Sequence, residues 1–160
     1  MNYGDIEIKD MENSYFLIGL LNAMMNNLQT VGDTFFEEMS WKQCFVTICI
    51  RLFKEPPSLK ELSEVMNSSH QNVRKMVERL EKNGFVKVEA DKKDKRKQRL
   101  VLTERAEVFT DRYRKPSDEF MNFIFSGISK EDLEITIRTL MQVNMRLNQY
   151  KDGYNKEVIL

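Results

Sequence analysis

The sequence predicts a mostly α-helical protein of the α+β class, built around a winged helix. Residues 58–83 hold two amphipathic helical stretches joined by a short polar turn, which is the pattern of a helix-turn-helix. Residues 85–102 then hold two apolar runs on either side of a polar loop, which is typical of a β-hairpin. Wide apolar stripes before and after this region predict a second, helical lobe.

The first helix of the helix-turn-helix is expected over residues 59–66. Its apolar residues recur at helical spacing: Leu59, Leu62, Val65 and Met66. The run Asn67-Ser68-Ser69 follows, and these residue types favour turns and caps over helix interiors. Ser68 or Ser69 can therefore N-cap a second helix.

The second helix is predicted to end at Asn83-Gly84, because both residues tolerate a left-handed C-terminal cap. Its apolar stripe consists of Val73, Met76, Val77 and Leu80. Cations and hydrogen-bond donors face outward: His70, Gln71, Asn72, Arg74, Lys75 and Arg79. Such a helix can read base edges in the DNA major groove. On its own, it is equally typical of a solvated surface.

The hairpin favours the nucleic-acid interpretation. Phe85, Val86 and Val88 lead into its loop, and residues 100–102 return from it. Residues 91–97 carry five cations, Lys92, Lys93, Lys95, Arg96 and Lys97, on a loop that cannot bury them. A cationic finger beside a candidate recognition helix fits contact with the DNA backbone or minor groove.

Three motifs resemble the MarR family of bacterial transcription regulators. They are residues 80–86 (LEKNGFV), residues 94–96 (DKR) in the wing, and residues 102–104 (LTE) at the junction from strand to helix. Their order and spacing both match the family pattern. The chain departs from it at Arg105-Ala106, where many members have a glycine, and this alters a local helix start.

The resemblance implies a sequence-specific regulator that binds double-stranded DNA as a homodimer on a pseudo-palindromic operator, with repression the commoner outcome. Arg96 would enter the minor groove, held by Asp94 through charge-assisted hydrogen bonding. The candidate DNA-binding residues are Ser68, Ser69, His70, Gln71, Asn72, Arg74, Lys75, Arg79, Lys92, Lys93, Asp94, Lys95, Arg96 and Lys97.

The resemblance also implies a site for a small aromatic or apolar effector between the dimer helices and the DNA-binding lobe. Its candidate lining residues are Met24, Met25, Phe35, Trp41 and Phe45. Residues of these types are equally typical of a protein core. No cofactor is expected.

We expect residues 1–160 to form one subunit, with a winged-helix DNA-binding lobe at 40–103 and a helical dimerisation lobe from 8–32 and 104–150. A helix from Asp10 to Val31 should end at Gly32-Asp33, which leaves Phe35 and Phe36 in a connection. A second helix, at 40–53, begins with a capping box of Ser40 and Gln43. Pro56-Pro57 then forces an extended link.

After the wing, Thr103 can cap a helix that runs to Phe125, with a kink or break at Pro116. A last helix over residues 130–147 is capped by Ser129 and Asp132, and the tail from Asp152 should fray. The candidate dimer-interface residues are Phe120, Phe123, Phe125 and Met145.

Charge is distributed unevenly along the chain, although Lys plus Arg and Asp plus Glu number 25 each. Residues 58–107 carry 13 basic and 9 acidic residues, whereas residues 1–57 carry 4 and 8. Positive charge on the winged-helix region is the expected footprint of a DNA binder. An acidic start and the absence of a long apolar run predict a cytoplasmic protein with no membrane segment.

Two other function classes receive less support. An enzyme would need a catalytic or metal-binding constellation, but the sole histidine, His70, lies in the candidate recognition helix, and no phosphate loop or metal-ligand cluster is present. A protein-interaction module remains an alternative, which salt-dependent DNA binding would exclude. Cys44 and Cys49 are five apart on one predicted helix and most resemble small buried hydrophobes, with a redox sensor as the alternative.

Overall fold

The computed structural model describes residues 2–3, 6–7 and 12–157 and confirms the mostly helical, winged-helix class. Contacts divide the chain into two compact units, residues 1–111 and residues 112–160. The first unit begins with a short antiparallel pair, β1 (Asn2–Tyr3) and β2 (Ile6–Glu7), which the sequence did not predict. The predicted helix start at Asp10 lies outside the described residues.

Helix α1 (Asn13–Phe35) runs past the predicted end at Gly32-Asp33, so that prediction and the placement of Phe35 in a connection were wrong. Gly32 is buried inside the helix, and a Cβ there would overlap the Trp41 indole. The glycine therefore serves close packing rather than helix termination. The Asp33 carboxylate instead accepts a hydrogen bond from the Trp41 backbone N–H at 2.7 Å.

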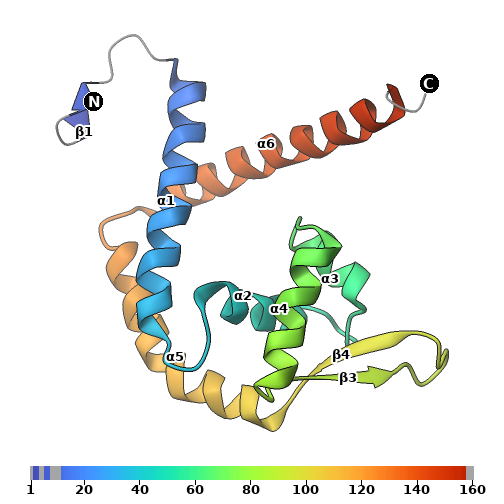
Figure 1. Cartoon of the computed structure of the whole chain (residues 1–160). Helices are drawn as coiled ribbons and strands as arrows, with labels where there is room; N and C mark the ends of the chain where they lie inside the picture. The colour runs from blue at the N-terminus through green and yellow to red at the C-terminus, as the bar shows by residue number, and fades with distance from the viewer. Residues whose placement is uncertain (1, 4–5, 8–11, 158–160) are drawn as a thin grey trace. The chain divides into compact units, whose positions relative to one another are not determined.

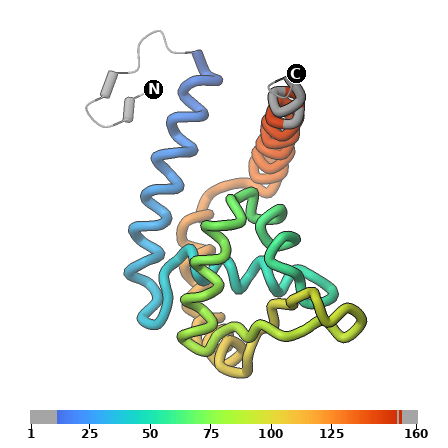
Figure 2. The backbone as a smooth tube through the Cα atoms, turned by 45° about the vertical axis from the view of Figure 1, so that its right-hand side comes forward, coloured from blue at the N-terminus to red at the C-terminus, as the bar shows by residue number. Residues whose placement is uncertain are grey.

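Three helices with side-chain N-caps form the body of the winged helix (Figures 1 and 2). They are α2 (Trp41–Arg51), α3 (Leu59–Val65) and α4 (His70–Lys82). Ser40 and Gln43 form the predicted capping box of α2, and Ser58 and Glu61 form another at α3. Ser69 caps α4, because its hydroxyl accepts a hydrogen bond from the Asn72 N–H at 3.3 Å.

The core of the first unit holds the predicted stripe of α4, of which Val73, Val77 and Leu80 are buried. On α3, Leu62 is buried but Val65 is 52% exposed, so the predicted stripe there was partly wrong. The same core also contains an aromatic cluster. The Phe109 ring lies 5.5 Å from Phe36 and 5.6 Å from Phe85 between centroids.

The predicted hairpin consists of β3 (Val86–Ala90) and β4 (Gln98–Leu102), paired antiparallel with Val86 opposite Leu102. Figures 1 and 2 show it projecting from the α2–α4 body with its loop outermost. The middle of β4 is attached to that body, since the Leu100 N–H donates to the Pro57 carbonyl at 2.8 Å.

Helix α5 (Glu104–Ile124) spans the boundary between the units, and α6 (Lys130–Glu157) belongs to the second. Thr103 and Ser129 cap them as predicted. Of the predicted kink or break near Pro116, the break is absent because α5 continues through it; a proline removes one hydrogen bond but need not end a helix. Helix α6 also extends beyond the predicted Leu147. Within the described part of the chain, no helix has the length and apolar character needed to span a membrane.

Candidate nucleic-acid interface

Helix α4 presents its polar face to solvent because its apolar face is anchored in the core. All the predicted contact residues on it are exposed: His70, Gln71, Asn72, Arg74, Lys75 and Arg79. Ser69 is exposed as well, but its hydroxyl already caps the helix, and Ser68 is half-buried. The first turns of α4 thus display amide, imidazole and cationic groups together, which is the chemistry that reads base edges.

The loop at the hairpin tip is held by its own backbone and by carboxylates within it. The Asp91 N–H donates to the Lys97 carbonyl at 2.9 Å, and the Lys97 N–H donates to the Asp94 carbonyl at 2.8 Å. Asp91 Oδ1 accepts the N–H groups of Lys93 and Asp94, each at 2.8 Å. The loop is therefore a defined turn, and its cations extend from a fixed backbone.

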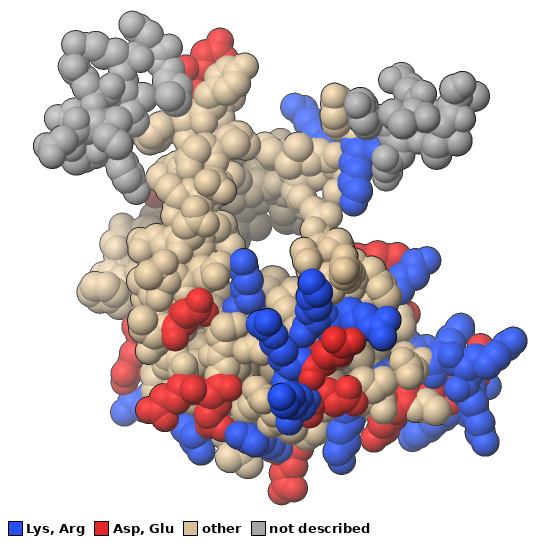
Figure 3. All heavy atoms as spheres, in the orientation of Figure 1, with Lys and Arg blue, Asp and Glu red and all other residues tan. Residues whose placement is uncertain are grey.

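The predicted pairing of Asp94 with Arg96 is present in the loop. Arg96 donates to Asp94 Oδ1 through its backbone N–H and through Nε, both at 3.2 Å, while its side chain remains 92% exposed. Lys92, Lys93, Lys95 and Lys97 are also exposed. Figure 3 shows Lys and Arg side chains gathered at the hairpin tip and over α4. The two predicted contact elements thus carry cations on one visible face.

Arg99 on β4 behaves differently from the other hairpin cations, and sequence reasoning did not single it out. Its Nε donates to Asp91 Oδ2 at 2.6 Å, and its Nη1 donates to Glu61 Oε2 at 2.9 Å. The hydrogen bond from Arg99 to Asp91, together with those from the backbone N–H groups of Asp94 and Lys93, holds the pKa of Asp91 well below its usual range. The pairing could not be predicted, because Glu61 is far from Arg99 in sequence.

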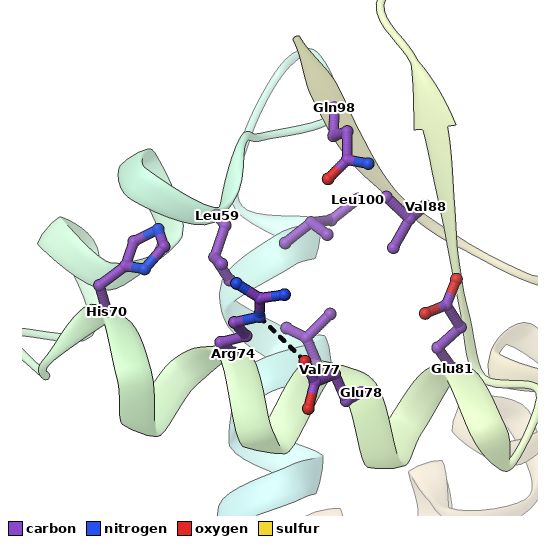
Figure 4. Close-up of a pocket in the computed structure, with 9 residues that line it drawn as sticks. All are labelled: Leu59, His70, Arg74, Val77, Glu78, Glu81, Val88, Gln98 and Leu100. Carbon is purple, nitrogen blue, oxygen red and sulfur yellow. Dashed lines mark hydrogen bonds and ion pairs between the residues drawn. The ribbon is translucent and has the colours of Figure 1, made fainter.

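A hollow of about 550 Å³ lies between α4 and the hairpin (Figure 4). Its apolar floor is formed by Leu59, Val77, Val88 and Leu100. His70 and Arg74 border it on α4, where Arg74 Nε is paired with Glu78 Oε1 at 2.9 Å. Arg74 is therefore already paired with a carboxylate on the same helix.

A larger hollow, of about 840 Å³, lies on the first unit between α1, α2 and the helix-turn-helix. Three of the five predicted effector residues line it, namely Met25, Trp41 and Phe45. Met24 and Phe35 are not among its lining residues, and the Phe35 ring packs edge-on against Phe36 at 5.0 Å. Ser68, Asn72 and Lys75 also line this hollow. Its volume lies in the range of small-molecule sites.

Both cysteines lie on α2. Cys44 and Cys49 are free thiols, and burial raises the pKa of Cys44 to about 11. Cys49 is buried, and its pKa is raised for the same reason. Reactive thiols need a lowered pKa, so this geometry favours a packing role. Among the residues that the structure describes, no group of His, Cys, Asp and Glu could hold a metal ion.

Comparison with solved structures shows the same fold in bacterial regulators. A MarR/EmrR family transcriptional regulator from Acinetobacter sp. ADP1 aligns with a TM-score of 0.75 and 14% identity, over 87% of this chain and 99% of the other. Streptococcus pneumoniae FabT, solved in complex with DNA, aligns with a TM-score of 0.65 and 16% identity, over 86% and 99%. Bordetella bronchiseptica BpsR, whose DNA binding is regulated by 6-hydroxynicotinic acid, aligns with a TM-score of 0.66 and 17% identity, over 88% and 98%.

The fold is that of a winged helix-turn-helix protein, and Lys and Arg side chains lie over α4 and the wing loop. Residues 48–97, which run from α2 to the wing loop, match the model of the MarR family. No curated protein matches the chain in sequence. Over the whole chain, the likeness to these regulators is a likeness of fold.

Proposed function

We propose that the protein is a homodimeric repressor that binds a pseudo-palindromic operator and is released by a small amphipathic ligand. The dimer is proposed because the second unit has no fully buried residues of its own among those described. None of residues 112–151 is buried in the single chain. Helices that leave much of their apolar face exposed are marginal in water, so these helices need a partner surface.

The apolar side chains available for that surface are large and numerous. Phe123 is 80% exposed, Met141 67% and Leu147 59%. The candidate interface residues Phe125 and Met145 are also exposed, whereas Phe120 is half-buried. Patches of this kind mark protein interfaces. A second copy of the chain carries the same helices, and a two-fold pairing presents two α4 helices to one side of a duplex.

On DNA, we assign base contacts to α4 and minor-groove contact to the wing. Gln71 and Asn72 suit adenine, and Arg74 suits guanine. Arg96 would enter the minor groove, where the negative potential attracts arginine. Its hydrogen bonds to Asp94 restrict the arginine before binding.

We place the ligand in the larger hollow because it combines an apolar interior with two cations. Trp41, Phe45 and Met76 would contact an aromatic or aliphatic body, while Lys42 and Lys75 would attract an anionic group. Ser68, Asn72 and Lys75 are also candidate DNA contacts. A ligand that engages them would change the affinity of α4 for DNA, which couples the two sites. An aromatic carboxylate such as benzoate is a suitable first probe.

The test of DNA binding is the substitution Arg96→Ala. A duplex selected from a random pool would serve as ligand, and affinity would be measured by fluorescence anisotropy over a range of salt concentrations. Arg96→Ala should weaken binding by about 1–3 kcal/mol, the usual value of a specific arginine contact. Lys115→Ala removes a comparably exposed cation from α5 and should bind like the wild type. Equal affinities for the two variants would contradict the wing assignment.

A further inference from the structure

Arg99 lies on the cation-rich hairpin, yet its surroundings differ from those of a DNA-contacting arginine. Its side chain is 28% exposed, against 92% for Arg96. It also lies between two carboxylates, those of Asp91 and Glu61. Because two negative charges oppose its one positive charge, this cluster offers no net attraction to a phosphate.

The partners of Arg99 belong to three separate segments of the first unit. Asp91 opens the wing loop, Glu61 lies in the first turn of α3, and the carbonyl of Pro56, at 3.3 Å from Nη1, belongs to the link before α3. Only the planar, multi-donor guanidinium can reach such a set at once. The side chain thus connects the wing loop to the start of the helix-turn-helix.

Both carboxylates are themselves fixed in place. Asp91 accepts two loop N–H groups through Oδ1 while Oδ2 accepts from Arg99. Glu61 Oε2 accepts the Ser58 N–H at 2.6 Å as part of the capping box of α3. The Ser58 backbone and hydroxyl, and then Arg99, lower the pKa of Glu61. Arg99 therefore bridges two anchored groups rather than two free side chains.

We propose that Arg99 is a positioning residue that locks the wing onto α3 and so sets where Arg96 meets the minor groove. The proposal rests on the DNA-binding function proposed above. The inner part of the hairpin stays anchored through Val86 and Leu100, but a two-stranded hairpin is marginally stable by itself, so the outer part of an unlocked wing would sample many orientations. Binding DNA would then require ordering the wing, and that entropic cost lowers affinity.

The first experiment is a double-mutant cycle with the selected duplex. Arg99→Met should weaken binding about tenfold, comparable to the loss of a groove contact. Arg96→Ala should then have little further effect in the Arg99→Met background, because an unlocked wing no longer delivers Arg96. Lys97→Met is the matched control, since this loop cation is exposed and its loss should add to that of Arg96→Ala. Additive losses for Arg96 and Arg99 would overturn the proposal.

Arg99→Lys separates positioning from simple charge. Lysine keeps the positive charge but cannot join Asp91, Glu61 and Pro56 at once. We therefore expect Arg99→Lys to bind about as weakly as Arg99→Met. Wild-type affinity for Arg99→Lys would show that only the charge matters and would also overturn the proposal.

Hydrogen exchange without DNA supplies a readout that is independent of DNA binding. The amides of Asp91 and Lys97 should exchange at least about tenfold faster in Arg99→Met, while those of α4 stay protected. If Arg99→Met loses protection throughout, Asp91→Asn takes its place, because it keeps the Oδ1 acceptor and loses only the arginine partner. Unchanged exchange in the loop would refute the lock. If the wild type binds no duplex, the proposed function fails, while this measurement still decides the role of Arg99.

Discussion

Single residues account for several features that sequence patterns left open. Arg105 stands where many MarR members have a glycine, and its guanidinium lies over the Phe85 ring, 4.7 Å from the centroid. It also pairs with Glu38 at 2.9 Å. The departure from the family pattern therefore adds a cation–π contact and an ion pair between α5, the residue before the wing and the α1–α2 connection.

The close packing of Trp41 on Gly32 can be tested by substitution. Gly32→Ala would place a methyl group against the Trp41 indole, and the resulting overpacking should destabilise the fold by about 1–3 kcal/mol. Gly19→Ala on the same helix is the control, because the space around Gly19 is open in the subunit. That change should stabilise the helix by about 0.5–1 kcal/mol. Denaturant unfolding measures both, and equal effects would exclude close packing at Gly32.

At the scale of elements, the turn between α3 and α4 sets the orientation of α4. Asn67 adopts a left-handed conformation with φ of 46°. Two backbone N–H groups of the turn bond back to α3: that of Asn67 donates to the Glu64 carbonyl, and that of Ser68 donates to the Ser63 carbonyl, each at 3.1 Å. This geometry makes the turn short, so the direction of α4 depends on one unusual backbone conformation.

Substitutions at Asn67 should follow backbone preference rather than polarity. Asn67→Gly should be tolerated, because glycine adopts positive φ without steric cost. Asn67→Val should cost about 1–2 kcal/mol or more, since a β-branched side chain is poorly suited to this region. Denaturant midpoints and operator affinity would both be measured. A stable, fully active Asn67→Val variant would show that the turn does not depend on the left-handed residue.

At the scale of the whole molecule, the two units differ in what they expose. The first unit has a buried core and a cationic face over α4 and the wing, whereas none of residues 112–151 of the second is fully buried in the single chain. The proposed dimer would cover the exposed apolar residues of the second unit. It would also hold two α4 helices at a fixed spacing, which allows them to recognise two half-sites.

A charge on the exposed apolar face of α6 would test the proposed dimer. Ile137→Glu places a charge on an exposed apolar position, where Ile137 is 50% accessible in the single chain. If this face is a dimer interface, the buried charge should convert the protein to monomers and weaken operator binding. Gln142→Glu adds the same charge at an exposed polar position of α6 and is the control. Analytical ultracentrifugation decides, and a wild-type protein that is monomeric at micromolar concentration would contradict the dimer.

Local signals predicted the elements well, because caps and turns are formed by neighbours in sequence. Ser40, Ser69, Thr103 and Ser129 all cap helices where expected, and the hairpin lies between the expected residues. Two predictions of helix ends were less successful. Gly32 lies within α1, where Trp41 packs closely on it, and α5 continues through Pro116, which removes only one helix hydrogen bond.

The sequence by itself determined the winged helix and the cationic wing, because these depend on periodicity, turn chemistry and motif spacing. Only the tertiary structure decided what individual charged and aromatic side chains do. Arg96 and Arg99 are both arginines on one hairpin, but one is exposed to solvent and the other is held between Asp91 and Glu61. The difference arises from the fold, which brings the start of α3 beside β4, a contact between residues 38 apart in the chain.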